Sequence, residues 1–253
     1  MKNKLFITAL LICLFAAPLF AGLTISPARV EVMLSTGGAY QNYFELTNNY
    51  DGDVNITVSM SDWMTYAGNK GVQVSDWLTV DTEPFTLGKG ESKRFNYSIE
   101  VKPNMVGQLG AYLSFTLRPP GNDMFLIKSS IPVYAAVYGT QKIDFKVLGA
   151  KFTEINGYLI GFISVQNKGN VNIRPKGSFS VKGPNKFKYI GEIREEMPVY
   201  AESTSSEIQF ALPKGLQLAP GKYIFYLTVG ALGKTQKKTV SMKIKDDGSI
   251  ENL

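Results

Sequence analysis

Arg29 is a residue whose type and position could bind a charged ligand. It lies within GLTISPARVEV at 22–32, a stretch otherwise typical of a β-strand. Its guanidinium presents a rigid fork of donors that matches a carboxylate. One interpretation is a solvated or ion-paired side chain, because Glu31 lies on the same face of the expected strand. Whether this cation serves a function or only the fold depends on the elements that position it.

The expected strand changes its buried face at Pro27. Before the proline, Leu23 and Ile25 share one face, whereas Val30 and Val32 after it lie on the other. Proline has no N–H group and cannot donate to a central ladder. We therefore predict either a bulge or a switch between sheets at Pro27.

Side chains that support enzymatic chemistry are scarce. The chain has no histidine, and its single cysteine, Cys13, lies in an N-terminal segment that we expect to be removed. Zinc and copper sites normally use His or Cys, and Ser or Cys nucleophiles normally need a His base. Two carboxylate pairs, Glu195 with Glu196 and Asp246 with Asp247, lie in expected loops with no second group opposite them. We therefore expect a protein that is not an enzyme and that needs no metal or cofactor.

The N-terminal segment is typical of a secretory signal peptide. Lys2 and Lys4 form a basic start, 5–20 is almost wholly apolar, and Ala21 provides a small residue for cleavage. The apolar run is shorter than the roughly 20 residues that span a bilayer. We expect cleavage after Ala21, no membrane insertion afterwards, and a periplasmic or secreted protein. Removing the two lysines leaves 25 basic and 21 acidic residues, a net charge of +4, which does not favour a nucleic-acid partner.

The remaining chain predicts an all-β fold. Alternation with a period of two recurs between Gly, Pro and Asn turns, and no segment has a helical period. Strands at this spacing indicate β-sandwiches, and the length allows two cores. The expected strands are 39–48, 53–66, 92–101, 110–119, 124–139, 157–169, 177–183, 205–212, 221–229 and 237–244.

The two halves of the chain repeat one pattern. FELTNNYDGDVNI at 44–56 and ISVQNKGNVNI at 163–173 each lead from a strand through an Asn and a tight turn into Val-Asn-Ile. Two immunoglobulin-like sandwiches in tandem would explain the repeat. We predict that they occupy 22–140 and 141–247, and that 248–253 is a flexible tail.

Five segments of the first half share their order and spacing with a known family. They are ARVEV at 28–32, ELTN at 45–48, WLTVDTEPFTLGKGES at 77–92, YLSFTLRPP at 112–120 and FLIKSSIPVYAAVYG at 125–139. With them the first domain resembles the periplasmic pilus-assembly chaperones (PapD-like). The second half is similar to their second domains in outline. The resemblance implies two immunoglobulin-like sandwiches and a pilin-like protein partner.

The resemblance implies a function for Arg29. In the family, an Arg in the first strand and a Lys in the last strand of the first domain hold the terminal carboxylate of a pilus subunit. Arg29 matches the first cation, whereas Pro132 aligns with the second and the nearest lysine, Lys128, comes four residues earlier. Half of this clamp is therefore missing, although an Arg fork can bind a carboxylate by itself.

The resemblance also implies a strand that is lent to the partner. Such chaperones carry a stripe of alternating large apolar side chains on this last strand, which completes the fold of a subunit. Phe125 and Ile127 match that stripe. The alternative is that these two side chains join Ile131 and Val133 in the core of their own sandwich.

Two hypotheses for the function follow. The first is an exported, non-enzymatic chaperone-like protein that binds an extended segment of a partner at the open edge of strand 124–137. Phe125 and Ile127 would fill apolar gaps of the partner, and Arg29 would hold a carboxylate. The alternative is a structural or adhesive cell-surface module without chaperone activity, favoured by the missing lysine and the short stripe.

Overall fold

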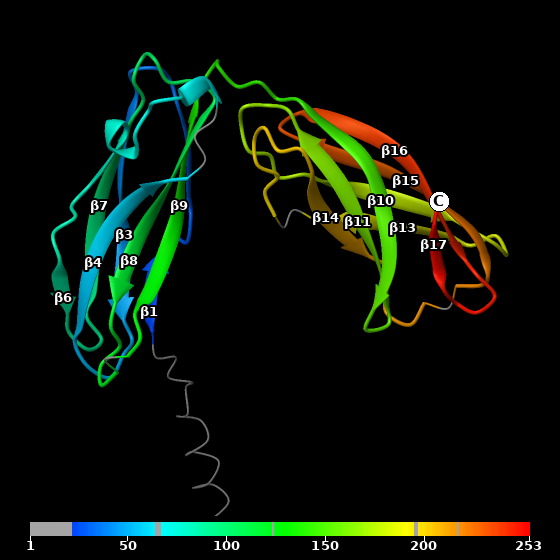
Figure 1. Ribbon diagram of the computed structural model, residues 1–253, viewed down its shortest axis with the longest axis horizontal. Coiled ribbons are helices and arrows are strands. Elements are labelled where there is room, and N and C mark those ends of the chain that lie inside the picture. The colour runs from blue at the N-terminus through cyan, green and yellow to red at the C-terminus, as the bar shows by residue number, and fades with distance from the viewer. Residues whose placement is uncertain (1–21, 64–66, 123, 195–196, 217) are drawn as a thin grey trace, which may run out of the picture. The chain divides into compact units, whose positions relative to one another are not determined.

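The computed structural model describes residues 22–63, 67–122, 124–194, 197–216 and 218–253 (Figure 1). The expected signal peptide at 1–21 and the pair Glu195 and Glu196 lie outside the described residues. The predicted all-β fold is confirmed, because the described residues form 17 strands and only two short 3-10 helices, η1 (Ala67–Asn69) and η2 (Val74–Asp76). No helix in this part of the chain has the length and apolar character needed to cross a membrane.

The chain folds into two compact units, which we call unit 1 and unit 2. The described residues of unit 1 fall within 22–63, 71–103 and 110–135, and those of unit 2 within 67–70, 104–109 and 136–253.

Unit 1 is built around two antiparallel layers. One sheet has the strand order β1-β3-β7-β5 and the other the order β2-β9-β8-β4-β6. The strands are β1 (Leu23–Ser26), β2 (Val30–Leu34), β3 (Ala39–Asn48), β4 (Val54–Asp62), β5 (Leu78–Val80), β6 (Phe85–Leu87), β7 (Ser92–Glu100), β8 (Gln108–Leu117) and β9 (Ile127–Val137).

Alternating apolar side chains from both layers fill the core of unit 1. Phe44 on β3, Phe95 on β7 and Phe115 on β8 are all buried. The ring centroids of Phe44 and Phe95 lie 6.2 and 5.4 Å from that of Phe115, in edge-to-face arrangements. Aromatic pairs favour this geometry, which adds to the stabilisation from burial. The period of two in the sequence therefore places large rings from different strands in one core.

Tyr97 places a phenol at the border of this core. It is buried, and its ring centroid lies 4.8 Å from that of Phe44 and 6.3 Å from that of Tyr40. Burial, and then the neighbouring Tyr40, raises the pKa of Tyr97 from 10.0 to about 12. The fold therefore favours the neutral form of this side chain.

We expect unit 1 to lose stability at alkaline pH through Tyr97. Because the folded pKa is raised, this contribution is fully present below the ordinary pKa of 10.0 and is lost as the pH rises through about 12. Ultraviolet titration of the native protein should show late phenols, and Tyr97→Phe should reduce their amplitude; burial also raises the pKa of Tyr223, which accounts for a remaining late phase. Tyr97→Phe should also flatten the fall in unfolding free energy over this range. A late amplitude that is unchanged in Tyr97→Phe would contradict the assignment to Tyr97.

The chain switches between the two sheets of unit 1 at Pro27. β1 pairs with β3 in one sheet, whereas β2, which begins at Val30, is hydrogen-bonded to β9 in the other. Of the two alternatives predicted from the sequence, a bulge or a switch, the switch is the one observed. It explains why the buried face changes from Leu23 and Ile25 to Val30.

Unit 2 is also built around two antiparallel layers. A three-stranded sheet has the order β10-β11-β14, and a five-stranded sheet has the order β13-β12-β15-β16-β17. The strands are β10 (Phe145–Ile155), β11 (Tyr158–Asn167), β12 (Lys176–Lys182), β13 (Lys188–Ile193), β14 (Ser206–Ala211), β15 (Gly221–Ala231), β16 (Lys234–Ile244) and β17 (Ile250–Asn252). Its core includes Phe152, Phe179, Phe210 and Phe225.

The sequence repeat has a structural basis in two buried asparagines. Asn48 ends β3, and its side-chain amide donates to the carbonyl oxygens of Gly52, Leu87 and Gly88 at 2.8 to 3.1 Å. Asn167 ends β11, and its amide donates to the carbonyl oxygens of Val171 and Val199 at 2.9 and 3.1 Å. Both side chains are fully buried.

Each asparagine also accepts a bond from its own turn. The Tyr50 N–H donates to Asn48 Oδ1, and the Gly169 N–H donates to Asn167 Oδ1, each at 2.9 Å. In both units, therefore, a buried asparagine at the end of an inner strand stabilises the following turn through its side-chain hydrogen bonds.

The predicted flexible tail at 248–253 is wrong. Its residues Ile250–Asn252 form β17, which pairs with Met242–Ile244 of β16. The side chain of Asn252 also reaches the other sheet, where its Oδ1 accepts from the Phe152 N–H at 2.6 Å and its Nδ2 donates to the Phe152 carbonyl at 3.2 Å. These backbone and side-chain bonds hold the segment in place.

Candidate partner-binding site

The inward-facing stripe of β9 continues beyond the buried core. Ile131 and Val133, which face the core, are 7% and 0% exposed. Ile127 and Phe125 continue the same alternation toward the N-terminus, but they are 39% and 62% exposed. The alternative that all four residues complete the core is therefore correct for Ile131 and Val133 and wrong for Phe125 and Ile127, whose binding to a partner stays a prediction. The later pair completes the core of unit 1, and the earlier pair remains available to a ligand.

The exposed apolar surface is larger than the sequence indicated. Met124 and Leu126, which flank Phe125, are 88% and 63% exposed. Soluble monomeric proteins normally bury at least part of a run of four consecutive large apolar side chains. The signal was present in the unbroken run Met124–Ile127, which interrupts the alternation of the strand. We call this run the apolar segment.

The prediction that the whole of strand 124–137 offers an open edge is wrong. β9 begins at Ile127 and lies between β2 and β8 in its sheet. The switch at Pro27 is the physical reason, because it brings β2 onto the edge of β9. However, β2 has five residues and β9 has eleven, so β2 pairs with only part of that edge.

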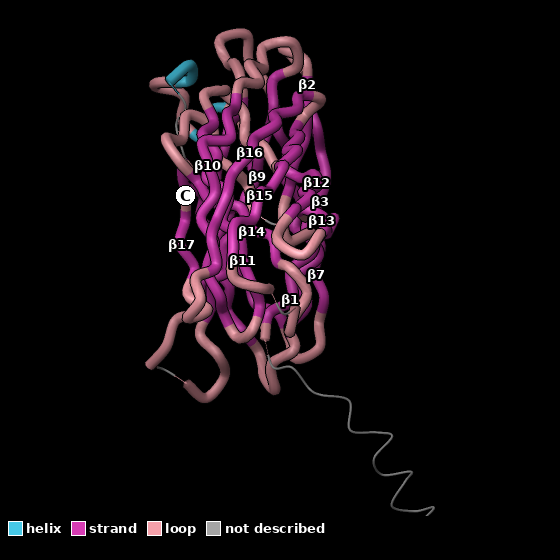
Figure 2. Tube along the Cα trace, turned by 90° about the vertical axis from the view of Figure 1, so that its right-hand side faces the viewer, coloured by secondary structure: helices cyan, strands magenta, loops and turns pink. Residues whose placement is uncertain are grey.

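β2 and β9 finish at the same end of unit 1. β1 pairs with the Glu45–Asn48 end of β3, whereas β2 (Figure 2) leads away from it into a turn where the Gly37 N–H donates to the Val101 carbonyl. β9 ends in the same region (Figure 1), where the Val137 N–H donates to the Gly107 carbonyl. We therefore expect β2 to pair with the later part of β9 and to leave the first residues of β9, next to the apolar segment, unpaired along one edge.

Arg29 lies directly before the first residue of β2. Its Nε is 3.1 Å from Glu31 Oε1, and the two side chains are 47% and 42% exposed. The ion-pair interpretation of Arg29 is therefore confirmed. Such exposed pairs contribute about 0 to 1 kcal/mol, so another carboxylate could replace Glu31 at little cost. Its function as a partner anchor stays a prediction.

The second cation of the clamp is absent from its expected position. Pro132 lies half-buried in the middle of β9. Lys128 is exposed and belongs to the start of the strand, next to the apolar segment. Arg29 is therefore the one cation at a position that the family resemblance implies, and Lys128 is the nearest lysine to the second position along the sequence.

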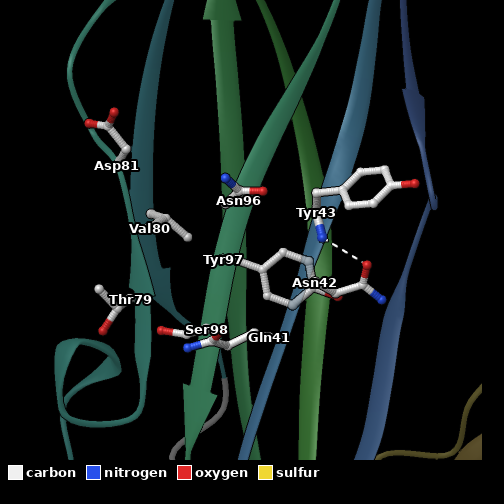
Figure 3. Close-up of a pocket in the computed structure, with 9 residues that line it drawn as sticks. All are labelled: Gln41, Asn42, Tyr43, Thr79, Val80, Asp81, Asn96, Tyr97 and Ser98. Atoms are coloured by element: carbon white, nitrogen blue, oxygen red, sulfur yellow. Dashed lines mark hydrogen bonds between the residues drawn. The ribbon is translucent and has the colours of Figure 1, made fainter.

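A separate hollow of about 690 Å³ lies on the sheet formed by β3, β7 and β5 (Figure 3). Polar side chains such as Gln41, Thr79, Asn96 and Ser98 line it together with Tyr43, Tyr97 and Val80, which contribute apolar surface. The polar side chains can form hydrogen bonds, but they provide no paired acid and base. Among the described residues, no group of three or more Cys, Asp, Glu or His side chains could hold a metal ion.

No protein-family model matches the chain. No curated protein matches it either. Solved structures similar to it include the class 5 fimbriae chaperone CfaA, with 14% identity, coverage of 86% of this chain and 98% of that chain, and a TM-score of 0.46. A chain of the CsuC–CsuE chaperone–tip adhesion subunit complex of Acinetobacter baumannii has 14% identity, coverage of 87% and 98%, and a TM-score of 0.45. The Pseudomonas aeruginosa CupB2 chaperone has 11% identity, coverage of 85% and 98%, and a TM-score of 0.44.

Proposed function

We propose that the chain is a non-enzymatic, chaperone-like protein that binds an extended segment of another protein by strand addition at the start of β9. Backbone groups of the unpaired edge would bond the incoming strand, and Phe125 and Ile127 would fill apolar gaps of the partner. The pairing of main-chain groups supplies affinity and the alternating side chains supply specificity. Arg29 would hold a carboxylate of the partner.

One observation carries the proposal. The apolar residues at the start of β9 and directly before it, Ile127 and Phe125, are exposed, and the five-residue β2 is too short to pair along all eleven residues of β9. Exposed apolar side chains next to an unpaired strand edge favour association with another strand. A partner with an incomplete sandwich, such as a pilin-like subunit, needs both of these elements.

The compartment and the domain limits belong to the same proposal. A signal peptide cleaved after Ala21 would release the chain into the periplasm or outside the cell, where pilin-like partners fold. The first sandwich would occupy 22–140, and the second would begin at 141 and include β17.

The proposal can be tested by coexpressing the chain with candidate pilin-like subunits from the same genome and measuring soluble subunit. We expect subunit recovery to depend on the chain. In the complex, hydrogen exchange should slow at backbone amides near Ile127, because strand addition gives them new acceptors. Recovery without the chain, or a complex in which these amides exchange as before, would contradict strand addition.

Arg29→Ala should weaken the complex about tenfold or more, because a charge-assisted bond to the partner's carboxylate is lost. The unfolding free energy should change by less than about 1 kcal/mol, since the pair with Glu31 is exposed. Titration of each protein with a purified subunit measures its affinity for that subunit. Glu31→Gln is the matched variant and should strengthen binding, because it frees the guanidinium. Equal affinities for all three proteins would assign Arg29 to the fold alone.

The second candidate function is a structural or adhesive surface module that lends no strand. It is favoured by the ion pair of Arg29 with Glu31 and by Pro132 at the position of the second cation. Under this function, subunit recovery would not respond to the chain. A gene neighbourhood without an outer-membrane usher would also support it.

A further inference from the structure

The outer surface of the five-stranded sheet of unit 2 is rich in lysine. Residues of β15 such as Phe225 and Leu227 point into the core, so the residues between them face outward. The pairing of β12, β13, β15 and β16 then places exposed lysines from all four strands on one outer surface. We call this surface the lysine face; its lysines are Lys176, Lys182, Lys188, Lys222, Lys237 and Lys243.

The charge of the lysine face is not balanced. Glu192 and Glu251 lie on the same side, so six lysines stand against two glutamates, a net charge of +4. Within the described part of the chain, none of the six lysines forms an ion pair. Lys182 stands directly opposite Lys188 in the ladder. Like charges in such positions destabilise a sheet, and the fold offsets this in part because the Lys182 Nζ lies 5.4 Å from the centroid of the Tyr226 ring.

Apolar side chains lie among these lysines. Ile190 is 77% exposed and Tyr226 is 41% exposed. Both pair with Ser180 on the strand between them, so the three residues form one row across the sheet. The adjacent row contains Lys188, Lys182 and Ile224. The surface therefore alternates cationic and apolar groups over a short distance.

A hollow of about 350 Å³ lies at the border of the lysine face. Lys222 and Lys238 contribute cations, Ser241 contributes a hydroxyl, and Leu148 and Ile224 contribute apolar surface. Lysine and hydroxyl groups bind phosphate oxygens, lysine as a point charge. The hollow therefore combines groups for an anionic head with groups for an apolar chain.

We propose that the lysine face binds the surface of a bilayer that contains anionic phospholipids. The lysines meet the phosphate groups, and Ile190 and Tyr226 enter the interfacial region, where an amphipathic tyrosine ring is favoured. Each lysine close to such a surface strengthens binding roughly fivefold. A dissolved polyanion would use the charges but would gain nothing from Ile190. This inference concerns unit 2 alone and does not rest on the proposed function.

The test is cosedimentation of the purified exported chain with vesicles. We expect binding to vesicles of phosphatidylglycerol in phosphatidylcholine and little binding to phosphatidylcholine alone. Binding should fall as ionic strength rises, because the screening length shortens from about 10 Å at 0.1 M to about 3 Å at 1 M salt. Equal binding to neutral vesicles would overturn the proposal.

Two charge-reversal variants make the test specific. The double variant Lys182→Glu and Lys243→Glu should bind at least tenfold less. The matched control, Lys146→Glu and Lys151→Glu, makes the same change of charge on exposed residues of β10 in the other sheet. It should bind within about threefold of the native chain, because its charges lie away from the bilayer. Equal losses in both variants would show that only net charge matters and would overturn the assignment to this face.

Ile190→Ser separates a bilayer from a soluble polyanion. It should weaken binding to the anionic vesicles several-fold and leave binding to heparin unchanged. All variants should keep the thermal unfolding midpoint of the native chain, since the substituted side chains are exposed. Binding to heparin or to an acidic protein without binding to the vesicles would overturn the proposal in favour of a soluble anionic partner.

Discussion

Phe125→Asp combined with Ile127→Asp is expected to abolish capture of an extended partner and to leave unit 1 folded. Burial of an apolar side chain of this size contributes about 1.5 to 3 kcal/mol, so the loss of both should weaken binding at least a hundredfold. Buried carboxylates without partners would add a further penalty. Both side chains are already exposed in the free chain, so the unfolding free energy should change by less than about 1 kcal/mol.

Leu126→Asp is the matched control for this double variant. Leu126 is as exposed as Phe125 and lies between the two substituted residues, but it is not one of the two positions that match the stripe. Strand addition through the stripe predicts a much smaller loss of affinity for Leu126→Asp. Calorimetry with a purified subunit would measure the difference. Similar losses of affinity in the double variant and in Leu126→Asp would indicate a nonspecific hydrophobic contact. Unchanged affinity in both would show that the apolar segment is not part of the binding site.

Asn48→Ala and Asn167→Ala are expected to destabilise the fold by about 2 to 4 kcal/mol each. The reason is the same in both units, because each substitution leaves buried carbonyl groups without a donor. For Asn48 these are the carbonyls bonded at 2.8 to 3.1 Å, and for Asn167 the two bonded at 2.9 and 3.1 Å. Denaturant unfolding measures the effect.

Asn96→Ala provides the comparison, since Asn96 is an exposed strand residue of unit 1. It should change the unfolding free energy by about 0.5 kcal/mol or less. If unit 1 and unit 2 unfold in separate steps, Asn48→Ala should shift one step and Asn167→Ala the other. Losses no larger than that of Asn96→Ala would show that water replaces the missing donors.

Several elements could be predicted because their cause is local in sequence. β3 matches its predicted range of 39–48, because buried Phe44 and Leu46 alternate with polar residues before the turn at Asn48. The change of face at Pro27 indicated the switch between sheets, and the repeated Asn indicated two related units. Each of these signals depends on residues only a few positions apart.

β10 was missed for an equally local reason. Before the register shift between Val147 and Gly149, the buried residues of β10 have odd numbers, Phe145 and Val147. After it, the buried residue is the even-numbered Phe152. A pattern with a period of two therefore fails across the strand. β17 was missed because its pairing with β16 follows a turn in a short polar segment.

The site could be predicted only in part, because burial depends on distant strands. Phe125 and Ile131 have the same character and the same phase on one strand, yet one is exposed and the other buried. What distinguishes them is the packing of the opposite sheet and the place where β2 joins β9, and neither follows from the residues of β9. The lysine face likewise requires the register of four strands.

The amide of Asn252 behaves as one residue of an additional strand. It bonds both the N–H and the carbonyl of Phe152, a residue 100 positions earlier. These main-chain groups on the edge strand β10 are therefore not available to pair with a strand of another molecule. Self-assembly into fibres by edge-to-edge stacking is therefore blocked at Phe152. If strand addition occurs at the start of β9 as proposed, the protein leaves one strand edge open to its partner and closes another against copies of itself.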